Sequence, residues 1–527
     1  MNLIQDAAQT AQGAAQTAEK KVVELAPDNW VPGGRPDPLS RHRPGLIGAP
    51  VSRLDGPLKV RGAARFAAEF ALDGMTYAAL VYSTVASGCI DTLDTAAAEA
   101  APGVVLVMTH RNAPPMKPTT LLLTEQKAAG GDNLPIMQDD RVHWNGQPVA
   151  LVLAETQEQA DHAKSLIRIA YTAEPATTAF DEAKARARAP SNVIGKPPRL
   201  AIGDAEAALA AARHKVDVTF RTSLHNHNAI EPHAVTLAWN GDELTIHDAS
   251  QGVVHAAWTI AQVFGIEEHQ VHVTSPFVGG SFGSKIVWRH HILAAAAAKL
   301  AGRPVRLALS REGVFRVVGG RANTEQRVAI GARADGRFDS IIHTGVSAMG
   351  QHSALPEPFT LATEILYAAG SFKLGIEAVD MNMLANTFMR APGEAVGTFA
   401  LECAVDELAE QIGIDPVELR LRNEPDKDPI KGTPFSSRHL VEAYRSGAER
   451  FGWGRRHAHP RAHRDGEWLI GMGVASGTYP YFRLPGGAAR ITLTCDGRAA
   501  VAVAAHDMGV GPRPHRRRSP PSGWDCR

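Results

Sequence analysis

Strand-like and helix-like hydrophobic patterns alternate along the first part of the chain. Strands are predicted where apolar runs are bounded by polar or turn residues, and helices where apolar residues recur every three to four positions. In chain order the segments are strand 75–83, helix 94–102, strands 103–109 and 147–156, and a helix running into a strand over 157–171. Such alternation is typical of mixed sheets covered by helices. We expect this unit to end near residues 186–192.

A second unit begins near Val216 and is richer in hairpins. Its predicted elements are a strand-rich stretch at 216–252 with a tight turn at 239–242, helix 253–265, strand 271–274, helix 289–302, hairpin 327–347, helix 397–413 and a final hairpin at 489–509 turning on Asp496–Gly497. The helix at 397–413 carries apolar positions at Phe399, Cys403, Leu408 and Ile412. Arg289, His290 and His291 open the helix at 289–302 and are expected to face solvent or a partner.

The two ends of the chain differ in character from the middle. The first 30 residues lack the regions of a signal peptide, and their helical spacing predicts a weakly amphipathic, partly disordered helix or a docking helix for a partner. A Pro/Gly/Arg linker follows at 31–50. Residues 512–527 are rich in Pro, Arg and Ser, which indicates a disordered basic tail or, as we favour, an interruption of the natural sequence by a frameshift or truncation.

Composition excludes several classes of protein. The 527 residues are enough for about three domains. Lys plus Arg and Asp plus Glu both number 55, so charge gives no reason to expect nucleic acid or an anionic membrane as partner. No apolar run is long enough for a membrane-spanning helix. Four scattered cysteines, expected to be buried free thiols, lack the spacing of an iron–sulfur cluster or a structural zinc site.

The segment "VHVTSPFVGGSFGSK" at 271–285 is the strongest candidate for chemistry. A strand, a glycine loop and a helix N-terminus present backbone N–H groups that suit an anionic or oxygen-rich ligand. The loop is neither a phosphate-binding GK[ST] loop nor a dinucleotide GxGxxG loop. The aromatic ring of Phe282 can wall a pocket and exclude water from a reactive centre.

Residues 276–285 resemble the "GGGFGGK" signature of the xanthine oxidase and aldehyde oxidase family of molybdenum hydroxylases. Residues 386–423, with "RAPGE", are similar to the molybdenum-binding subunits of bacterial aldehyde oxidoreductases, above all the periplasmic three-subunit enzymes. Segments 231–239 and 248–252 also fit, and the resemblance extends from about Gly48 to Gly511.

The resemblance implies an α+β fold. A hammerhead-like α/β domain at 48–190 would precede the first part of a molybdopterin-binding domain at 191–511. An N-terminal helix and linker at 1–47 and an aberrant tail at 512–527 would flank them.

The resemblance also implies roles for individual residues. No side chain would bind molybdenum directly, since the pterin holds the metal. Arg390 would stabilise negative charge on the substrate's carbonyl oxygen. The residues that would contact the cofactor are Gln251, through its amide, with Gly252; Phe282 and Gly283 beside the metal; and Met508, Gly509 and Val510 in a glycine-rich loop around the dinucleotide phosphates.

Three features depart from the family pattern. Serines occupy positions 281 and 284, where the signature has glycines. Ile286 follows Lys285, where xanthine-type enzymes have a glutamate, which favours aldehydes over purines as substrates. The "KGVGE" motif that carries the family's general-base glutamate does not occur in the sequence, and Glu394 and Glu402 are framework residues rather than substitutes for it.

The implied function is the oxidation of aldehydes to carboxylic acids with water as oxygen source, on a molybdenum–molybdopterin cytosine dinucleotide. Electrons would pass to separate [2Fe-2S] and FAD subunits, in the cytoplasm or the periplasm. Two alternatives stay open. One is an interrupted, catalytically inert chain, and the other is a zinc- and anion-binding protein that uses His225, His227 and His233 on one face of a strand.

Overall fold

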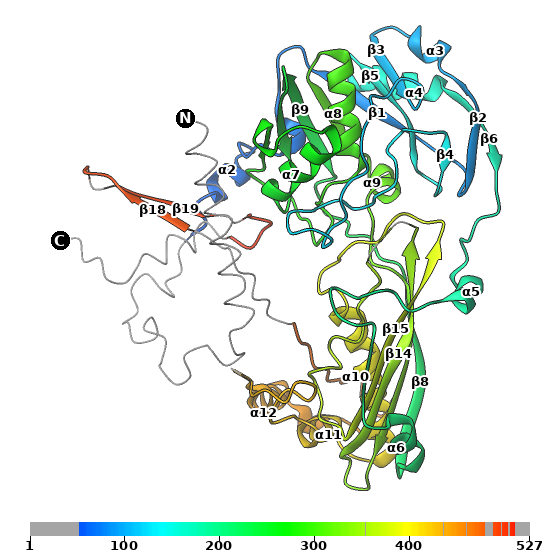
Figure 1. Ribbon diagram of the computed structural model, residues 1–527. Coiled ribbons are helices and arrows are strands. Elements are labelled where there is room, and N and C mark those ends of the chain that lie inside the picture. Colours follow the sequence, from blue (N-terminus) through cyan, green and yellow to red (C-terminus); the bar gives the residue numbers. More distant parts are fainter. Residues whose placement is uncertain are drawn as a thin grey trace, which may run out of the picture.

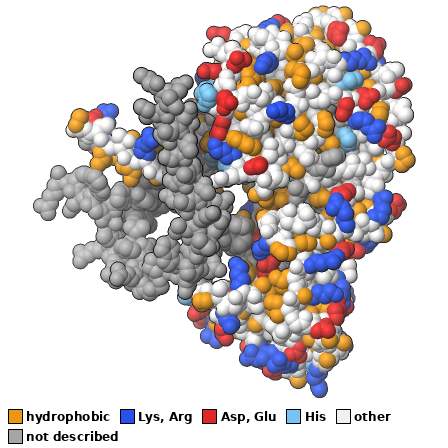
Figure 2. Space-filling view, viewed as in Figure 1, with side chains coloured by type: hydrophobic (Ala, Val, Ile, Leu, Met, Phe, Trp, Pro, Cys, Tyr) orange, Lys and Arg blue, Asp and Glu red, His pale blue; other side chains and the backbone are white. Residues whose placement is uncertain are grey.

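The computed structural model describes residues 52–511 apart from 352, 354, 436, 460, 480–488, 497 and 504–505. The predictions for 1–47 and 512–527 lie outside the described residues. Figure 1 shows two parts joined end to end, each built on one large sheet with helices packed against it. The fold is α+β, as predicted. Figure 2 shows acidic and basic side chains interspersed over the visible face, in keeping with their equal numbers in the sequence.

The first part is built on a seven-stranded mixed sheet. In spatial order its strands are β11 (Val271–Thr274), β10 (Glu243–Asp248), β9 (Ala234–Asn240), β12 (Val305–Ala308), β1 (Thr76–Tyr82), β5 (Pro148–Ala154) and β3 (Val104–Thr109). A three-stranded sheet lies beside it, formed by β4 (Arg141–Val142), β2 (Gly88–Asp94) and β6 (Arg168–Ala173).

The seven-stranded sheet contains strands from both sides of the predicted domain boundary at residue 190. β1 pairs in parallel with β12, with Thr76 opposite Val305, and the Thr76 hydroxyl donates to the carbonyl of Pro304 at 2.9 Å. The boundary stays a prediction about sequence segments. In three dimensions the segments on either side of it share one hydrogen-bonded sheet.

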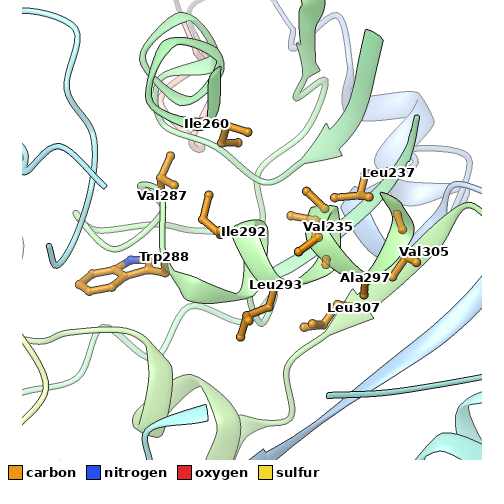
Figure 3. Packing of buried hydrophobic residues seen from close by; sticks show 14 of the residues in the cluster. Val235, Leu237, Ile260, Val287, Trp288, Ile292, Leu293, Ala297, Val305 and Leu307 are labelled. Atoms are coloured by element: carbon orange, nitrogen blue, oxygen red, sulfur yellow. The ribbon is translucent and has the colours of Figure 1, made fainter. Parts of the chain in front are cut away.

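Helices cover both faces of this sheet. α8 (Arg289–Ala301) lies on one face, where the small side chains Ala294–Ala298 let the helix approach the strands closely. Figure 3 shows Ile292, Leu293 and Ala297 of α8 packed among apolar side chains of β9 and β12. α4 (Gln157–Leu166) covers the other face and begins with a capping box in which Thr156 accepts from the Gln159 amide. Every residue of β5 is buried as a result.

The second part is built on a five-stranded sheet with helices on opposite faces. Its order is β7 (Arg199–Ile202), β15 (Ser371–Met381), β14 (Phe338–Gly350), β13 (Thr324–Ala332) and β8 (His214–Thr222). Along β13, Val328 and Ile330 pack towards α10 (Glu394–Ile412), whereas Ala329 packs towards α6 (Ala205–Ala211). This alternation along the strand explains why both faces of the sheet are apolar.

The other elements are short or lie at the edges. The helices are α2 (Gly56–Val60), α3 (Ala96–Glu99), α5 (Phe180–Ala183), α7 (Val253–Phe264), α9 (Arg311–Val317), α11 (Pro416–Arg422) and α12 (Leu440–Phe451), with 3-10 turns at Ala67–Glu69, Lys184–Arg186, Glu268–Gln270 and Trp453–Arg455. Two small hairpins are β16 (Arg464–Asp465) with β17 (Trp468–Leu469) and β18 (Ala489–Leu493) with β19 (Ala499–Val503). No helix within the described residues is long and apolar enough to span a membrane.

The helix predicted at 397–413 is α10; its face towards the core is centred on Leu401 and Val405, while Phe399 is 47% exposed. Two other expectations were wrong. Of the cysteines that the structure describes, all are unpaired as predicted, but Cys495 is exposed and two others are only partly buried. The start of α8 is fully buried rather than facing solvent, and buried carboxylates pair with its polar side chains, Asp132 with Arg289 and Asp248 with His291.

Candidate functional site

The glycine loop lies between β11 and α8 and turns through the left-handed region at three positions. Phe282 has φ +58°, and Gly280 and Gly283 have φ +91° and +114°. This backbone path displays the Phe282 ring, which is 43% exposed, while Ser281 and Ser284 are buried. A bulky residue in this conformation is strained, so the surrounding structure must hold it there. The loop therefore holds the aromatic ring of Phe282 in a fixed position.

Gln251 lies directly against this loop, just before α7. Its backbone N–H donates to the carbonyl of Lys285 at 2.9 Å. Its side-chain Oε1 accepts from the Lys285 N–H at 3.1 Å and from the Ser281 hydroxyl. Because a backbone N–H can only donate, these contacts identify the inward atom as oxygen and turn the amide NH₂ away from the loop. No residue that the structure describes accepts a hydrogen bond from that NH₂.

Residues 388–391 form the other side of the site. The N–H of Arg390 donates to the carbonyl of Phe282 at 2.8 Å. The two segments are so close that a Cβ on Gly283 would lie 2.1 Å from the carbonyl oxygen of Phe388. The Arg390 side chain is exposed and forms no ion pair within the described part of the chain. Phe282, Gly283 and Arg390 thus lie together, and their places beside the metal and the substrate stay predictions.

A buried ion pair between Arg321 and Glu357 holds the turn at residues 389–391. Nη2 of Arg321 donates to the carbonyls of Met389, Arg390 and Ala391, of which the last two lie at 2.5 and 3.3 Å. Its Nε lies 3.3 Å from Oε1 of Glu357, and the same carboxylate oxygen accepts from the Gly393 N–H at 2.7 Å. One guanidinium and one carboxylate therefore fix the path of the turn.

Glu357→Gln is expected to make the protein lose less stability than the wild type does as pH rises. Burial raises the pKa of the Glu357 carboxyl from 4.5 to about 7, against the opposing effect of Arg321. The folded protein then binds more protons than the unfolded chain between these values. The favourable contribution of the Glu357 carboxyl to the free energy of unfolding is fully present below the pKa of this group in the unfolded chain. It is lost as pH rises through the pKa of the group in the folded protein. The full shift corresponds to roughly 3 kcal/mol.

The measurement is the melting temperature of wild type and variant between about pH 5 and 8.5. The variant's melting temperature minus that of the wild type should increase with pH, whatever its value at pH 5. A difference that stays constant across the range contradicts the assignment.

The loop at 506–511 approaches the same region at the start of α7. The N–H of Val253 donates to Nε2 of His506 at 3.3 Å. The Asp507 carboxylate accepts from the amides of Gly509 and Gly511 at 2.9 and 3.1 Å, and it also pairs with Arg53 at 2.8 Å. Two loop amides predicted to hold phosphate are thus bound within the loop.

The other predicted cofactor residues lie around these contacts. Met508 is half-buried, and Gly509 and Val510 are exposed. Gly252 is the N-cap of α7, and its N–H donates to the Ser250 hydroxyl at 3.1 Å.

A buried charge pair between Lys285 and Glu231 supports the glycine loop. Nζ of Lys285 pairs with Oε2 of Glu231, and the same oxygen accepts from the Gly279 N–H at 2.6 Å. Burial lowers the pKa of the Lys285 ammonium, and Glu231 opposes that shift. The pair anchors both ends of the loop to the segment that precedes β9.

The zinc alternative is not supported by the geometry. Residues 225–233 form an irregular segment rather than a strand, so the histidines do not share a face. His227 bonds to the carbonyl of Phe388 at 2.7 Å and His233 to that of Ser284 at 3.2 Å. No cluster of three or more potential metal-binding side chains occurs among the residues that the structure describes. His227 and His233 thus hydrogen-bond to the backbone on the two sides of the site, at Phe388 and Ser284.

The basic residues at the N-terminus of α8, Arg289 to His291, are buried next to the glycine loop. Arg289 pairs with Asp132 at 2.8 Å, and His291 bonds to Asp248 at 3.1 Å. His290 is fully buried, and burial holds the pKa of its imidazole well below the usual value. These side chains connect the loop to the core of the first part.

Arg321 and Glu357 were not predicted from the sequence, and Ser281 was noted as a departure from the signature without a role for its hydroxyl. Arg321 follows Gly319 and Gly320, whose missing side chains let two other segments approach, since Cβ atoms there would lie 2.0 Å from the Ala385 carbonyl oxygen and 2.3 Å from that of His225. The Gly-Gly-Arg triplet was a signal of close packing. Glu357 lies in a loop with no local pattern that marks it.

Comparison with known proteins agrees with this fold. Residues 61–175 match the aldehyde oxidase and xanthine dehydrogenase a/b hammerhead domain, and residues 186–424 match the molybdopterin cofactor-binding domain. These matches define the class of protein, in which a hammerhead domain precedes a domain that binds a molybdenum–pterin cofactor.

Curated relatives support a more specific assignment. The chain is 37% identical over 478 residues to the aldehyde oxidoreductase molybdenum-binding subunit PaoC of Escherichia coli K12, covering 88% of this chain and 62% of that protein. It is 30% identical to a putative xanthine dehydrogenase molybdenum-binding subunit, XdhA, of the same strain, covering 87% and 63%. The chain belongs to the aldehyde oxidase and xanthine dehydrogenase family, and it spans somewhat under two thirds of the length of these relatives.

Solved structures show the same fold. The aldehyde oxidoreductase from Desulfovibrio gigas superposes with a TM-score of 0.67 at 26% identity, covering 76% of this chain and 46% of that one. Quinoline 2-oxidoreductase from Pseudomonas putida 86 superposes with a TM-score of 0.69 at 21% identity, covering 78% and 55%, and this likeness concerns the fold alone.

Proposed function

We propose that this chain is the molybdenum-cofactor-binding part of an enzyme that oxidises aldehydes to carboxylic acids. The observation that carries the proposal is the meeting of Gln251, Phe282 and Arg390 from three separate segments. Similarity to a subunit named as an aldehyde oxidoreductase adds weight to this choice of substrate.

The residues present fit a pterin-chelated molybdenum. Gln251 offers an amide NH₂ with no acceptor among the described residues, and the loop beside it presents the exposed ring of Phe282. When bound, the cofactor would accept two electrons from the substrate and transfer oxygen that derives from water. Gln251 would donate a hydrogen bond to an oxygen or sulfur ligand of the metal. Gly252, Phe282, Gly283, Met508, Gly509 and Val510 would lie along the rest of the cofactor.

The remaining side chains would act on the substrate. Phe282 would shield the reacting carbon from bulk water. Arg390 would stabilise negative charge developing on the carbonyl oxygen, since its backbone is held on a fixed turn and its guanidinium forms no ion pair with a residue that the structure describes. Ile286, which is half-buried and lines a narrow cavity with Leu121 and Ser353, would present an apolar surface that suits an aldehyde better than a purine.

Electrons must leave the cofactor after each turnover. The cysteines of this chain lack iron–sulfur spacing. Because the relative PaoC is named as the molybdenum-binding subunit of its enzyme, we propose that separate [2Fe-2S] and FAD subunits receive them, and that the pterin is the cytosine dinucleotide form. The resulting assembly would be a heterotrimer.

The test is a cofactor analysis of the protein purified from its own cells with any bound subunits. We expect molybdenum by elemental analysis, a fluorescent pterin after oxidation, and cytidine monophosphate after acid hydrolysis. Arg390→Ala should keep the molybdenum and lower kcat/KM for aldehydes by about a hundredfold or more. Zinc in place of molybdenum, or the absence of pterin from cells supplied with molybdate, would refute the proposed function.

A further inference from the structure

Ser281 has a hydroxyl group at one of the most enclosed points of the glycine loop. The residue is 1% exposed. Its hydroxyl donates to Oε1 of Gln251 and accepts from the Lys285 N–H at 3.2 Å. The hydroxyl therefore lies between the loop backbone and the glutamine amide, and it has no contact with solvent that could replace these partners.

The terminal amide of a glutamine needs such support. Its last torsion is soft and roughly two-fold, so the oxygen and the NH₂ group can exchange places at little cost unless neighbours distinguish them. In this chain two donors converge on the oxygen, the Lys285 N–H and the Ser281 hydroxyl. With a glycine at 281, as in the family signature, only the Lys285 N–H would remain.

We propose that Ser281 is a positioning residue that orients Gln251, so that the glutamine NH₂ faces the bound cofactor. This proposal rests on the proposed function, because the cofactor is what the NH₂ would meet. Ser281 itself lies behind the glutamine and acts only through it. The replacement of a signature glycine by serine thus has a specific consequence at the metal site.

Ser284 provides a matched control within the same loop. It is also fully buried, and its hydroxyl donates to the carbonyl of Ser281 at 2.8 Å rather than to Gln251. Ser284→Ala removes one buried hydroxyl and its hydrogen bond within the loop, whereas Ser281→Ala removes a buried hydroxyl that donates to Gln251 and accepts from the Lys285 N–H. Any effect of loop stability alone should appear in both variants.

The test compares wild type, Ser281→Ala, Ser284→Ala and Gln251→Ala, each purified with its bound subunits. The electron paramagnetic resonance spectrum of the bound molybdenum should shift in Ser281→Ala towards that of Gln251→Ala and stay unchanged in Ser284→Ala. For Ser281→Ala, kcat should fall about fivefold, the effect of one hydrogen bond, with KM changed less than twofold. Adding Ser281→Ala to Gln251→Ala should have no further effect on kcat.

Neutron crystal structures of the two serine variants, which distinguish the amide oxygen from the NH₂ group, provide a readout that does not depend on cofactor loading. Gln251 should adopt a turned or mixed orientation in Ser281→Ala and a single orientation in Ser284→Ala. A wild-type spectrum or an unchanged Gln251 in Ser281→Ala overturns the positioning role and leaves the proposed function intact. Loss of molybdenum in Ser281→Ala but not in Gln251→Ala also overturns it, since the serine would then hold the loop. Absence of molybdenum from the wild type refutes the function itself.

Discussion

Replacement of Arg420 by methionine is expected to destabilise the second part of the protein by roughly 3–5 kcal/mol, the usual cost of leaving one member of a buried ion pair uncompensated. Arg420 lies on α11 with a completely buried side chain. Its Nε donates to Glu402 of α10 at 2.9 Å and its Nη1 to Asp406 at 2.8 Å. Glu402 also accepts from the Tyr367 hydroxyl and from the Ser476 N–H. Without the guanidinium, the Glu402 carboxylate stays buried with no cation.

The measurement is thermal denaturation combined with hydrogen exchange across α10. Arg422→Met on the same helix is the control, because Arg422 is partly exposed and pairs with Glu418 one turn away; its loss should cost about 1 kcal/mol or less. The double variant Arg420→Met/Glu402→Gln should recover part of the stability, since no unpaired charge is left. An Arg420 variant as stable as the Arg422 variant would contradict the role of the pair.

Gly283→Ala is expected to separate the two sides of the candidate site. An alanine there would have to adopt φ +114° and place its Cβ 2.1 Å from the carbonyl oxygen of Phe388. That contact cannot be relieved by rotating a side chain, so one of the two segments must move. The bond from the Arg390 N–H to Phe282 would then be lost. We expect molybdenum occupancy at least about tenfold lower, since a free-energy change of only 1.4 kcal/mol suffices for that factor.

Gly280→Ala is the control for this variant. Gly280 also has a positive φ, but an added Cβ would meet only a ring atom of Phe282 at 3.3 Å and Cβ of Ala229 at 3.4 Å. The control therefore has similar backbone strain without the clash between two backbones. Hydrogen exchange at 386–391 should increase in Gly283→Ala and much less in Gly280→Ala. Equal effects in both would mean that strain, rather than the close approach of the segments, dominates.

Most helices and strands could be predicted because their signals are local. α7, α8 and α10 all end at a glycine in the left-handed conformation, and the tight turns between β9 and β10 and between β13 and β14 have glycine where the chain reverses. Phe399 shows where such signals fail. It follows the helical period of α10 but lies at the edge of the contact with the sheet, where its ring meets Phe220 of β8, while the neighbouring Ala400 and Leu401 are fully buried in the core.

The candidate site was predictable in part, and only through resemblance. Gln251, Phe282 and Arg390 come from segments more than a hundred residues apart at their extremes, so spacing alone could not bring them together. The resemblance predicted that they meet at one site, and the structure places Arg390 against Phe282 and Gln251 against the same loop; their roles there stay predictions. The side chains that hold them, above all Arg321 and Glu357, act through backbone carbonyls and amides. Such contacts depend on the path of two distant loops, and no residue pattern encodes that path.

The parallel pairing of β1 with β12 sets an order of events during synthesis. The paired residues Thr76 and Pro304 are 228 positions apart. At about 5–20 residues per second, the edge of β1 that β12 covers stays open for roughly 10–50 seconds after β1 has been made. β5 can protect the other edge much earlier, since its last residue is Ala154. An open strand edge is a template for aggregation. The nascent chain is therefore most vulnerable between the translation of its fifth and its twelfth strand, and chaperones that bind emerging polypeptides should matter most in that interval.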